Sequence, residues 1–127
     1  MEVTHTTALF AGSFFGALTI VIGAFGAHAL KKHMTKEVLE SFETGVRYQM
    51  YHALLLLIIG FMPFNSYSYY AGNIIIIGVI LFSFSIYGLA LSTTFGKKIK
   101  ILGPITPIGG LALVIGWILL FISFLSL

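Results

Sequence analysis

Residues 69–94 read YYAGNIIIIGVILFSFSIYGLALSTT, a run without one charged side chain. A helix rises 1.5 Å per residue, so about 20 apolar residues cross the hydrocarbon core of a bilayer. Because this run exceeds that length, it predicts a transmembrane helix rather than the buried core of a soluble domain.

Three further apolar stretches accompany this run, at residues 6–30, 47–62 and 104–125. The 127-residue chain is 58% hydrophobic and 9% charged, whereas soluble domains carry roughly a quarter charged residues. The sequence therefore predicts one domain over residues 1–127 with an all-α fold, an integral membrane four-helix bundle.

The second stretch is short, and an amphipathic segment precedes it. Thr35 is a predicted N-cap, and Glu37 lies in the first turn, where the helix dipole favours negative charge. We expect this interfacial segment between spans 1 and 2 to continue into the second span, straight or bent at Gly45. Its apolar face is formed by Val38, Leu39, Phe42 and Val46.

The basic residues lie in or beside two loops only: Lys31, Lys32, Lys36, Arg47, Lys97, Lys98 and Lys100. The positive-inside rule then predicts that loops 31–46 and 95–103 are cytoplasmic and that both termini are outside. A net charge of +3 would also suit a nucleic-acid partner, but confinement to two loops fits topology better. We expect membrane lipids, a second copy or another membrane protein as partners, and no nucleic acid.

The composition excludes several kinds of chemistry. The chain has no cysteine, so disulfides, thiolate zinc sites and iron–sulfur clusters are excluded. A cation-coupled pump normally needs a carboxylate near the midplane, but the four acidic residues all precede Thr44. No nucleophile–base pair is apparent, so we expect no enzyme activity, no metal and no cofactor.

One group of polar residues stands near the predicted inner interface: His28, Glu43, Arg47, Tyr48, Gln49 and His52. Glu43 and Arg47 are four residues apart, as are Tyr48 and His52, so each pair shares a helix face. We predict one hydrogen-bonded cluster. Its plainest role is packing, with Arg47 snorkelling beside Glu43 and the other polar groups linking helices.

The functional alternatives are a lipid or anion headgroup site on Arg47, a proton relay, and a bis-histidine metal or haem site. Two histidines without a third ligand make the metal alternative weak.

Small residues on the first span indicate a close helix contact. Gly12, Gly16 and Gly23 recur at helical spacing and serve either internal packing, which we favour, or self-association. The fourth span opens with a motif of prolines and glycines, which is either an ordinary helix start or a re-entrant, ligand-lining one. Its residues are Gly103, Pro104, Thr106, Pro107, Gly109 and Gly110. Trp117 falls mid-span, so its indole N–H is expected to find a partner inside the bundle.

Four stretches together resemble one family: GAFGAHAL at 23–30, FETGVRYQMYHAL at 42–54, LFSFSIY at 81–87 and GPITPIGG at 103–110. It is the small membrane family called domain of unknown function 423, with YgdD- and YwdK-like bacterial members and an animal branch, transmembrane protein 256. The family pattern has glycine where this chain has Phe84. The resemblance implies a four-span protein of the bacterial plasma membrane without an established activity. His28, Arg47, Gln49, His52, Pro104 and Pro107 match its pattern as positions, not as catalytic residues.

Together these features favour a non-enzymatic accessory or scaffold protein that packs with lipid or a partner and supports membrane integrity. The alternative is a small transporter or channel that uses the His28–Arg47–His52 cluster near the cytoplasmic side.

Overall fold

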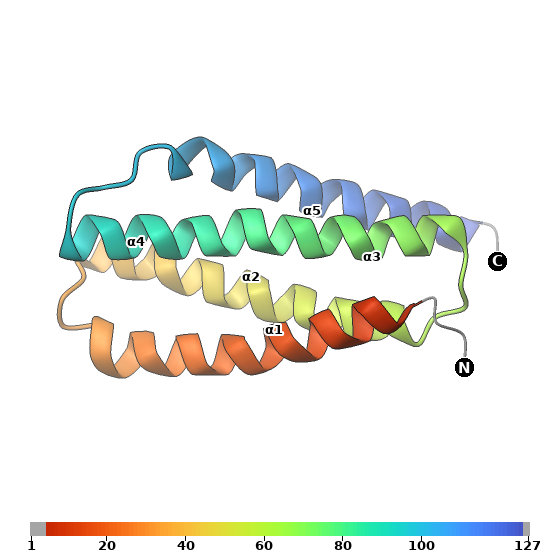
Figure 1. Ribbon diagram of the computed structural model, residues 1–127, viewed down its shortest axis with the longest axis horizontal. Coiled ribbons are helices and arrows are strands. Elements are labelled where there is room, and N and C mark those ends of the chain that lie inside the picture. Colours follow the sequence, from red (N-terminus) through yellow and green to blue (C-terminus); the bar gives the residue numbers. More distant parts are fainter. Residues whose placement is uncertain (1–4, 126–127) are drawn as a thin grey trace.

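A computed structural model describes residues 5–125, and within this range the chain forms four antiparallel helical rods without a strand (Figure 1). The rods are α1 Thr6–Phe25 with the π-helical turn η2 Gly26–Leu30; α2 Lys36–Gly60; α3 Ser66–Val79 with the π-helical turn η3 Ile80–Phe84 and α4 Ser85–Phe95; and α5 Leu102–Leu125. The all-α prediction is confirmed.

The amphipathic segment is the first half of α2 and not a separate helix. Thr35 is the N-cap as predicted, because its Oγ1 accepts a hydrogen bond from the Val38 N–H at 3.2 Å. The helix passes Gly45 without a break and ends at Gly60. Of its predicted apolar face, Phe42 is buried, whereas Val38, Leu39 and Val46 are half-buried.

Three of the described rods are long and apolar enough to cross a membrane: Thr6–Leu30, Ser66–Phe95 and Leu102–Leu125. α2 is not among them, and its first half carries Lys36, Glu37, Glu40, Glu43 and Arg47. It nevertheless runs beside the other rods over their length (Figure 1). A crossing by α2 at residues 47–62 stays a prediction.

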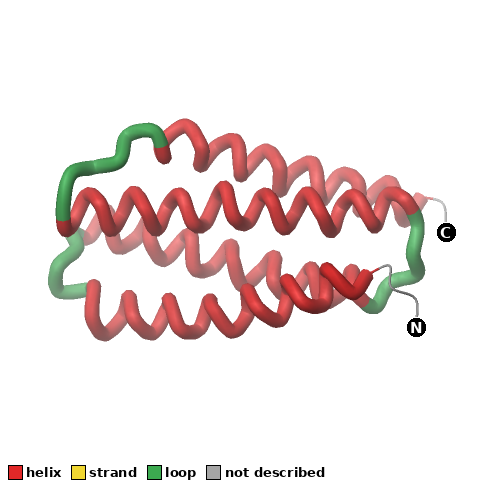
Figure 2. Tube along the Cα trace, in the orientation of Figure 1, coloured by secondary structure: helices red, strands yellow, loops and turns green. Residues whose placement is uncertain are grey.

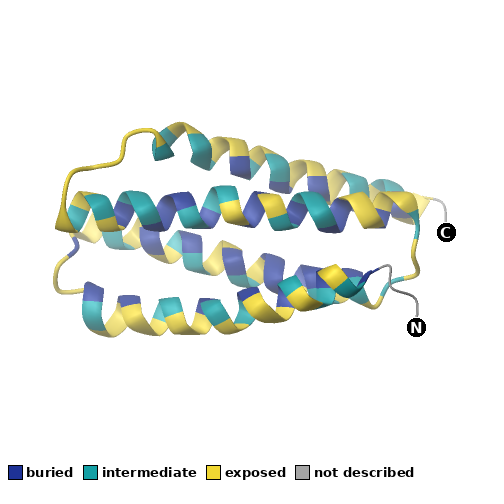
Figure 3. Ribbon diagram, in the orientation of Figure 1, coloured by how far each residue is buried: buried dark blue, intermediate teal, exposed yellow. Residues whose placement is uncertain are grey.

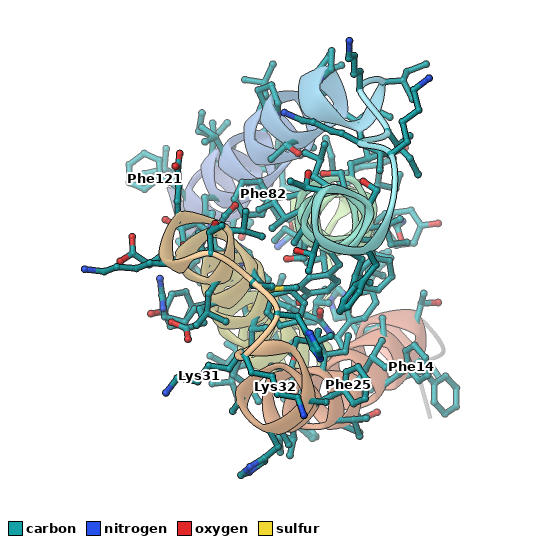
Figure 4. All side chains as sticks on the ribbon, turned by 90° about the vertical axis from the view of Figure 1, so that its left-hand side faces the viewer. Phe14, Phe25, Lys31, Lys32, Phe82 and Phe121 are labelled. Atoms are coloured by element: carbon teal, nitrogen blue, oxygen red, sulfur yellow. The ribbon has the colours of Figure 1, made fainter. Side chains whose placement is uncertain are left out.

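The connections place all six lysines at one end of the bundle. Residues 31–35 and 96–101 connect rods at this end, whereas residues 61–65 and both ends of the described chain lie at the other (Figure 2). We call the lysine-bearing end the basic end; Figure 4 looks onto it and shows Lys31 and Lys32 at the first connection. The two predicted basic loops therefore share one side of the bundle.

The core follows from which helices pair. α1 packs chiefly on α2 and α5 chiefly on α3, and α2 joins these two pairs by contacting α3 and α4. Buried residues face these contacts (Figure 3), with Leu56, Ile59 and Ile75 fully enclosed. A second cluster, around Phe42 and Tyr87, closes the basic end.

Candidate functional site

One face of α2 makes polar contacts with several other helices. Gly45, Gln49 and His52 are spaced by four and three residues, which places them on one side of a helix. Gln49 is 0% exposed; its Nε2 donates to the Phe15 carbonyl at 3.0 Å and its Oε1 accepts from the Tyr87 hydroxyl at 2.6 Å. One side-chain amide thus joins α1, α2 and α4.

His52 extends the same face toward α5. The indole N–H of Trp117 donates to His52 Nε2 at 3.1 Å, which is the partner within the bundle that the sequence predicts. An indole can only donate, so Nε2 is an acceptor and Nδ1 carries the proton. Nδ1 then donates to the Tyr48 carbonyl at 2.7 Å, and the imidazole is neutral in this arrangement.

Hydroxyl groups complete the contacts between helices. Ser83 Oγ donates to the Gly45 carbonyl at 2.8 Å, and Ser85 and Thr106 share a 2.6 Å hydrogen bond that joins α4 to α5. Within the described residues, no buried side-chain nitrogen or oxygen lacks a hydrogen-bond partner. This inner network is therefore closed, as expected of polar groups that link helices.

The six residues predicted to form one cluster lie partly inside the bundle and partly on its surface. Gln49 and His52 point inward, whereas Glu43 and Arg47 are exposed. Each residue turns a helix by about 100°, so positions 43 and 47 lie on the side of α2 opposite to 45, 49 and 52.

The remaining two members lie at the margin. His28 is exposed on η2. Tyr48 is 40% exposed, and its ring stacks on His52 with centroids 6.3 Å apart. Of the six residues, Tyr48, Gln49 and His52 belong to the inner network, and the other three do not. The prediction of a single cluster is therefore wrong.

Two of the exposed members, Glu43 and Arg47, line a groove between the basic-end half of α1–η2 and the first half of α2, whereas His28 and Tyr48 lie outside its lining. This groove, which we call the α1–α2 groove, has a volume of about 200 Å³. Its lining residues are Gly23, Gly26, Ala27, Leu39, Phe42, Glu43, Val46 and Arg47. Arg47 Nη2 donates to Thr44 Oγ1 at 3.1 Å, and within residues 5–125 the guanidinium forms no ion pair. The groove thus combines an apolar floor with two opposite charges.

Gly12, Gly16 and Gly23 all face α2. A Cβ on Gly12 would lie 2.8 Å from the Ala53 carbonyl oxygen, and one on Gly23 would lie 3.3 Å from Val46. Gly16 is looser, at 4.0 Å from the Ala53 Cβ. Internal packing, the alternative that the sequence favours, is therefore what these glycines serve.

The start of the fourth span is an ordinary helix and not a re-entrant segment. α5 runs unbroken from Leu102 with Pro107 inside it. A Cβ on Gly109 would collide with the backbone N of Phe82, whereas one on Gly103 would meet nothing within 4 Å. Gly110 faces the Phe82 ring, and Pro104 lies in the first helical turn. The motif lets α5 approach η3 closely.

Sequence reasoning gave Tyr87 and Ser83 no role in the network. They are four residues apart on the third rod, which places both on the face that meets α2. The same four-residue spacing separates Gly45 and Gln49 on α2, and the match between the two spacings could have predicted these contacts.

Comparison with known proteins gives a consistent result. The family model described as "Protein of unknown function (DUF423)" matches residues 22–110. A UPF0382 membrane protein of Staphylococcus haemolyticus is 41% identical over 88% of this chain and 89% of its own length. UPF0382 membrane protein YwdK of Bacillus subtilis is 38% identical, covering 88% and 90%. A UPF0382 membrane protein of Schizosaccharomyces pombe is 39% identical, covering 80% and 87%. No solved structure matches.

Proposed function

This chain belongs to the membrane protein family described as Protein of unknown function (DUF423), and from that premise we propose a non-enzymatic accessory role. The protein packs with phospholipid at its basic end and thereby supports membrane integrity. The observation that carries this proposal is the α1–α2 groove, where Arg47 stands over an apolar floor.

The setting of the groove supports a phospholipid occupant. Arg47 is exposed, and a guanidinium offers several donors to phosphate oxygens in a planar fork. The lysines of the basic end add attraction for anionic headgroups, about 1 kcal/mol each near a membrane surface. A headgroup with the beginning of an acyl chain matches the mixed lining.

The same charges support an orientation in the bacterial plasma membrane. Lysine-rich connections are retained on the cytoplasmic side, so the basic end faces the cytoplasm and both termini face outward. The α1–α2 groove then opens in the inner leaflet.

A transporter or channel has less support. That alternative needs His28, Arg47 and His52 along one path, but His28 and Arg47 are exposed while His52 is 5% exposed and bonded to Trp117. Solute flux in liposomes that disappears in His52→Ala would favour transport instead.

Native mass spectrometry from mild detergent tests the accessory role. The wild-type protein should retain phospholipid, and Arg47→Ala should lose most of it. Lys36→Ala is the matched control, because it removes a basic residue at the same end but outside the groove. It removes only part of the general attraction for anionic headgroups and should lose less phospholipid than Arg47→Ala. Equal retention by Arg47→Ala and the wild type would contradict the proposal. In cells, Arg47→Ala should reproduce the sensitivity of a deletion strain to detergent.

A further inference from the structure

The two charges of the α1–α2 groove are not paired with each other. Glu43 and Arg47 are one turn apart on α2, a spacing at which acidic and basic side chains ordinarily meet. Here Arg47 donates to Thr44 Oγ1 at 3.1 Å, and within residues 5–125 neither Glu43 nor Arg47 takes part in an ion pair. The groove therefore presents a carboxylate and a guanidinium side by side, both exposed and both open to a ligand.

The rest of the lining is apolar or lacks a side chain. Phe42, Val46 and Leu39 form one wall, and Gly23 and Gly26 lower the opposite one. A Cβ on Gly26 would collide with the Phe42 ring, so the ring lies directly against the α1–η2 backbone. A matching ligand has an apolar stem and a head with one positive and one negative group.

We propose, on the basis of the lipid-packing function above, that the α1–α2 groove selects phosphatidylethanolamine. Its phosphate binds Arg47 and its primary ammonium donates to Glu43. Side chains one helical turn apart have Cβ atoms about 5–6 Å apart, and the two-carbon ethanolamine linker keeps ammonium and phosphate at a comparable separation.

The other common headgroups satisfy only part of this arrangement. Phosphatidylglycerol brings a phosphate for Arg47 but has no ammonium, so the Glu43 carboxylate is left without a cationic partner beside the phosphate. Phosphatidylcholine has a quaternary ammonium without an N–H, so it cannot donate a hydrogen bond to a carboxylate. Attraction by the lysines alone would instead enrich phosphatidylglycerol.

Competition between lipids tests the selectivity. The full-length protein is equilibrated in mild detergent with equimolar phosphatidylethanolamine, phosphatidylglycerol and phosphatidylcholine of identical acyl chains, and the retained lipids are counted by native mass spectrometry. The wild type should retain phosphatidylethanolamine about three- to fivefold over either competitor, as expected for one exposed charge pair. Glu43→Gln should shift the preference to phosphatidylglycerol while total lipid is kept.

Glu40→Gln is the matched control, since it removes the same charge one turn away and outside the groove. Its preference should equal that of the wild type. A wild-type preference for phosphatidylglycerol, equal retention of all three lipids, or an unchanged preference in Glu43→Gln would overturn the selectivity and leave general lipid packing intact. A folded wild-type protein that retains no lipid would overturn both proposals.

Discussion

The indole N–H of Trp117 on α5 lies 3.1 Å from Nε2 of His52 on α2, and this hydrogen bond connects two helices that otherwise hardly touch. His52 is 5% exposed, whereas Trp117 is 49% exposed. The bond thus reaches from the inside of the bundle to its surface. Since the chain has one tryptophan, its fluorescence reports on the surroundings of Trp117, of which His52 is a part.

Removal of the imidazole should therefore change both spectrum and stability. In His52→Ala the indole N–H loses its acceptor, so the emission maximum should shift and the free energy of unfolding should fall by about 1 kcal/mol. Fluorescence and thermal denaturation in detergent measure the two effects. His28→Ala is the matched control, because that histidine is exposed. Identical emission from His52→Ala and the wild type would refute the contact.

Gln49 and Tyr87 should behave as a coupled pair. Gln49→Leu leaves the Tyr87 hydroxyl without its acceptor, which costs about 1–3 kcal/mol for a buried polar group. Tyr87→Phe should cost about 1 kcal/mol. The double variant should lose less than the sum, because the two single changes break the same bond. Unfolding by SDS, followed by circular dichroism, measures the cycle; strict additivity would show that the pair is not coupled.

The two glycines at 103 and 109 make a matched test of the α5–η3 contact. Gly109→Ala places a methyl group against the Phe82 backbone, which cannot move aside as a flexible side chain does. It should destabilise the fold by about 1–3 kcal/mol, as overpacking does. Gly103→Ala meets nothing within 4 Å and should be neutral or slightly stabilising. Thermal denaturation should separate the two variants; equal melting temperatures would contradict the close approach.

The orientation can be checked with single cysteines, since the chain has none. Tyr67 is 46% exposed at the end opposite to the lysines, and Ile99 is 49% exposed in the connection between α4 and α5. A membrane-impermeant maleimide should label Tyr67→Cys in intact cells. It should label Ile99→Cys only after the membrane is opened. The reverse pattern would place the basic end outside.

The positions of the helices could be predicted from the sequence because each depends on local chemistry. Residues 6–30 are one apolar run that is helical throughout, and Thr35 caps α2 through its own hydroxyl. The partner of Trp117 could be placed inside the bundle for a similar reason, since a mid-span indole N–H needs an acceptor.

The sequence did not predict which polar residues face inward and which face outward, because this depends on how far each helix is rotated about its axis. Closeness in sequence grouped Glu43 with Gln49, but they face opposite sides of α2. The acceptor for Tyr87 lies 38 residues earlier in the chain, so it follows only from the packing of α4 on α2.

The contacts made by Gly45, Gln49 and His52 should disfavour insertions and deletions in this segment of α2. Insertion of one residue between Gly45 and His52 would turn one contact about 100° away from the others. Ser83, Tyr87 and Trp117 would then have no common partner face. Variation in chain length between relatives is therefore expected in the connection at residues 96–101 and not between residues 45 and 52.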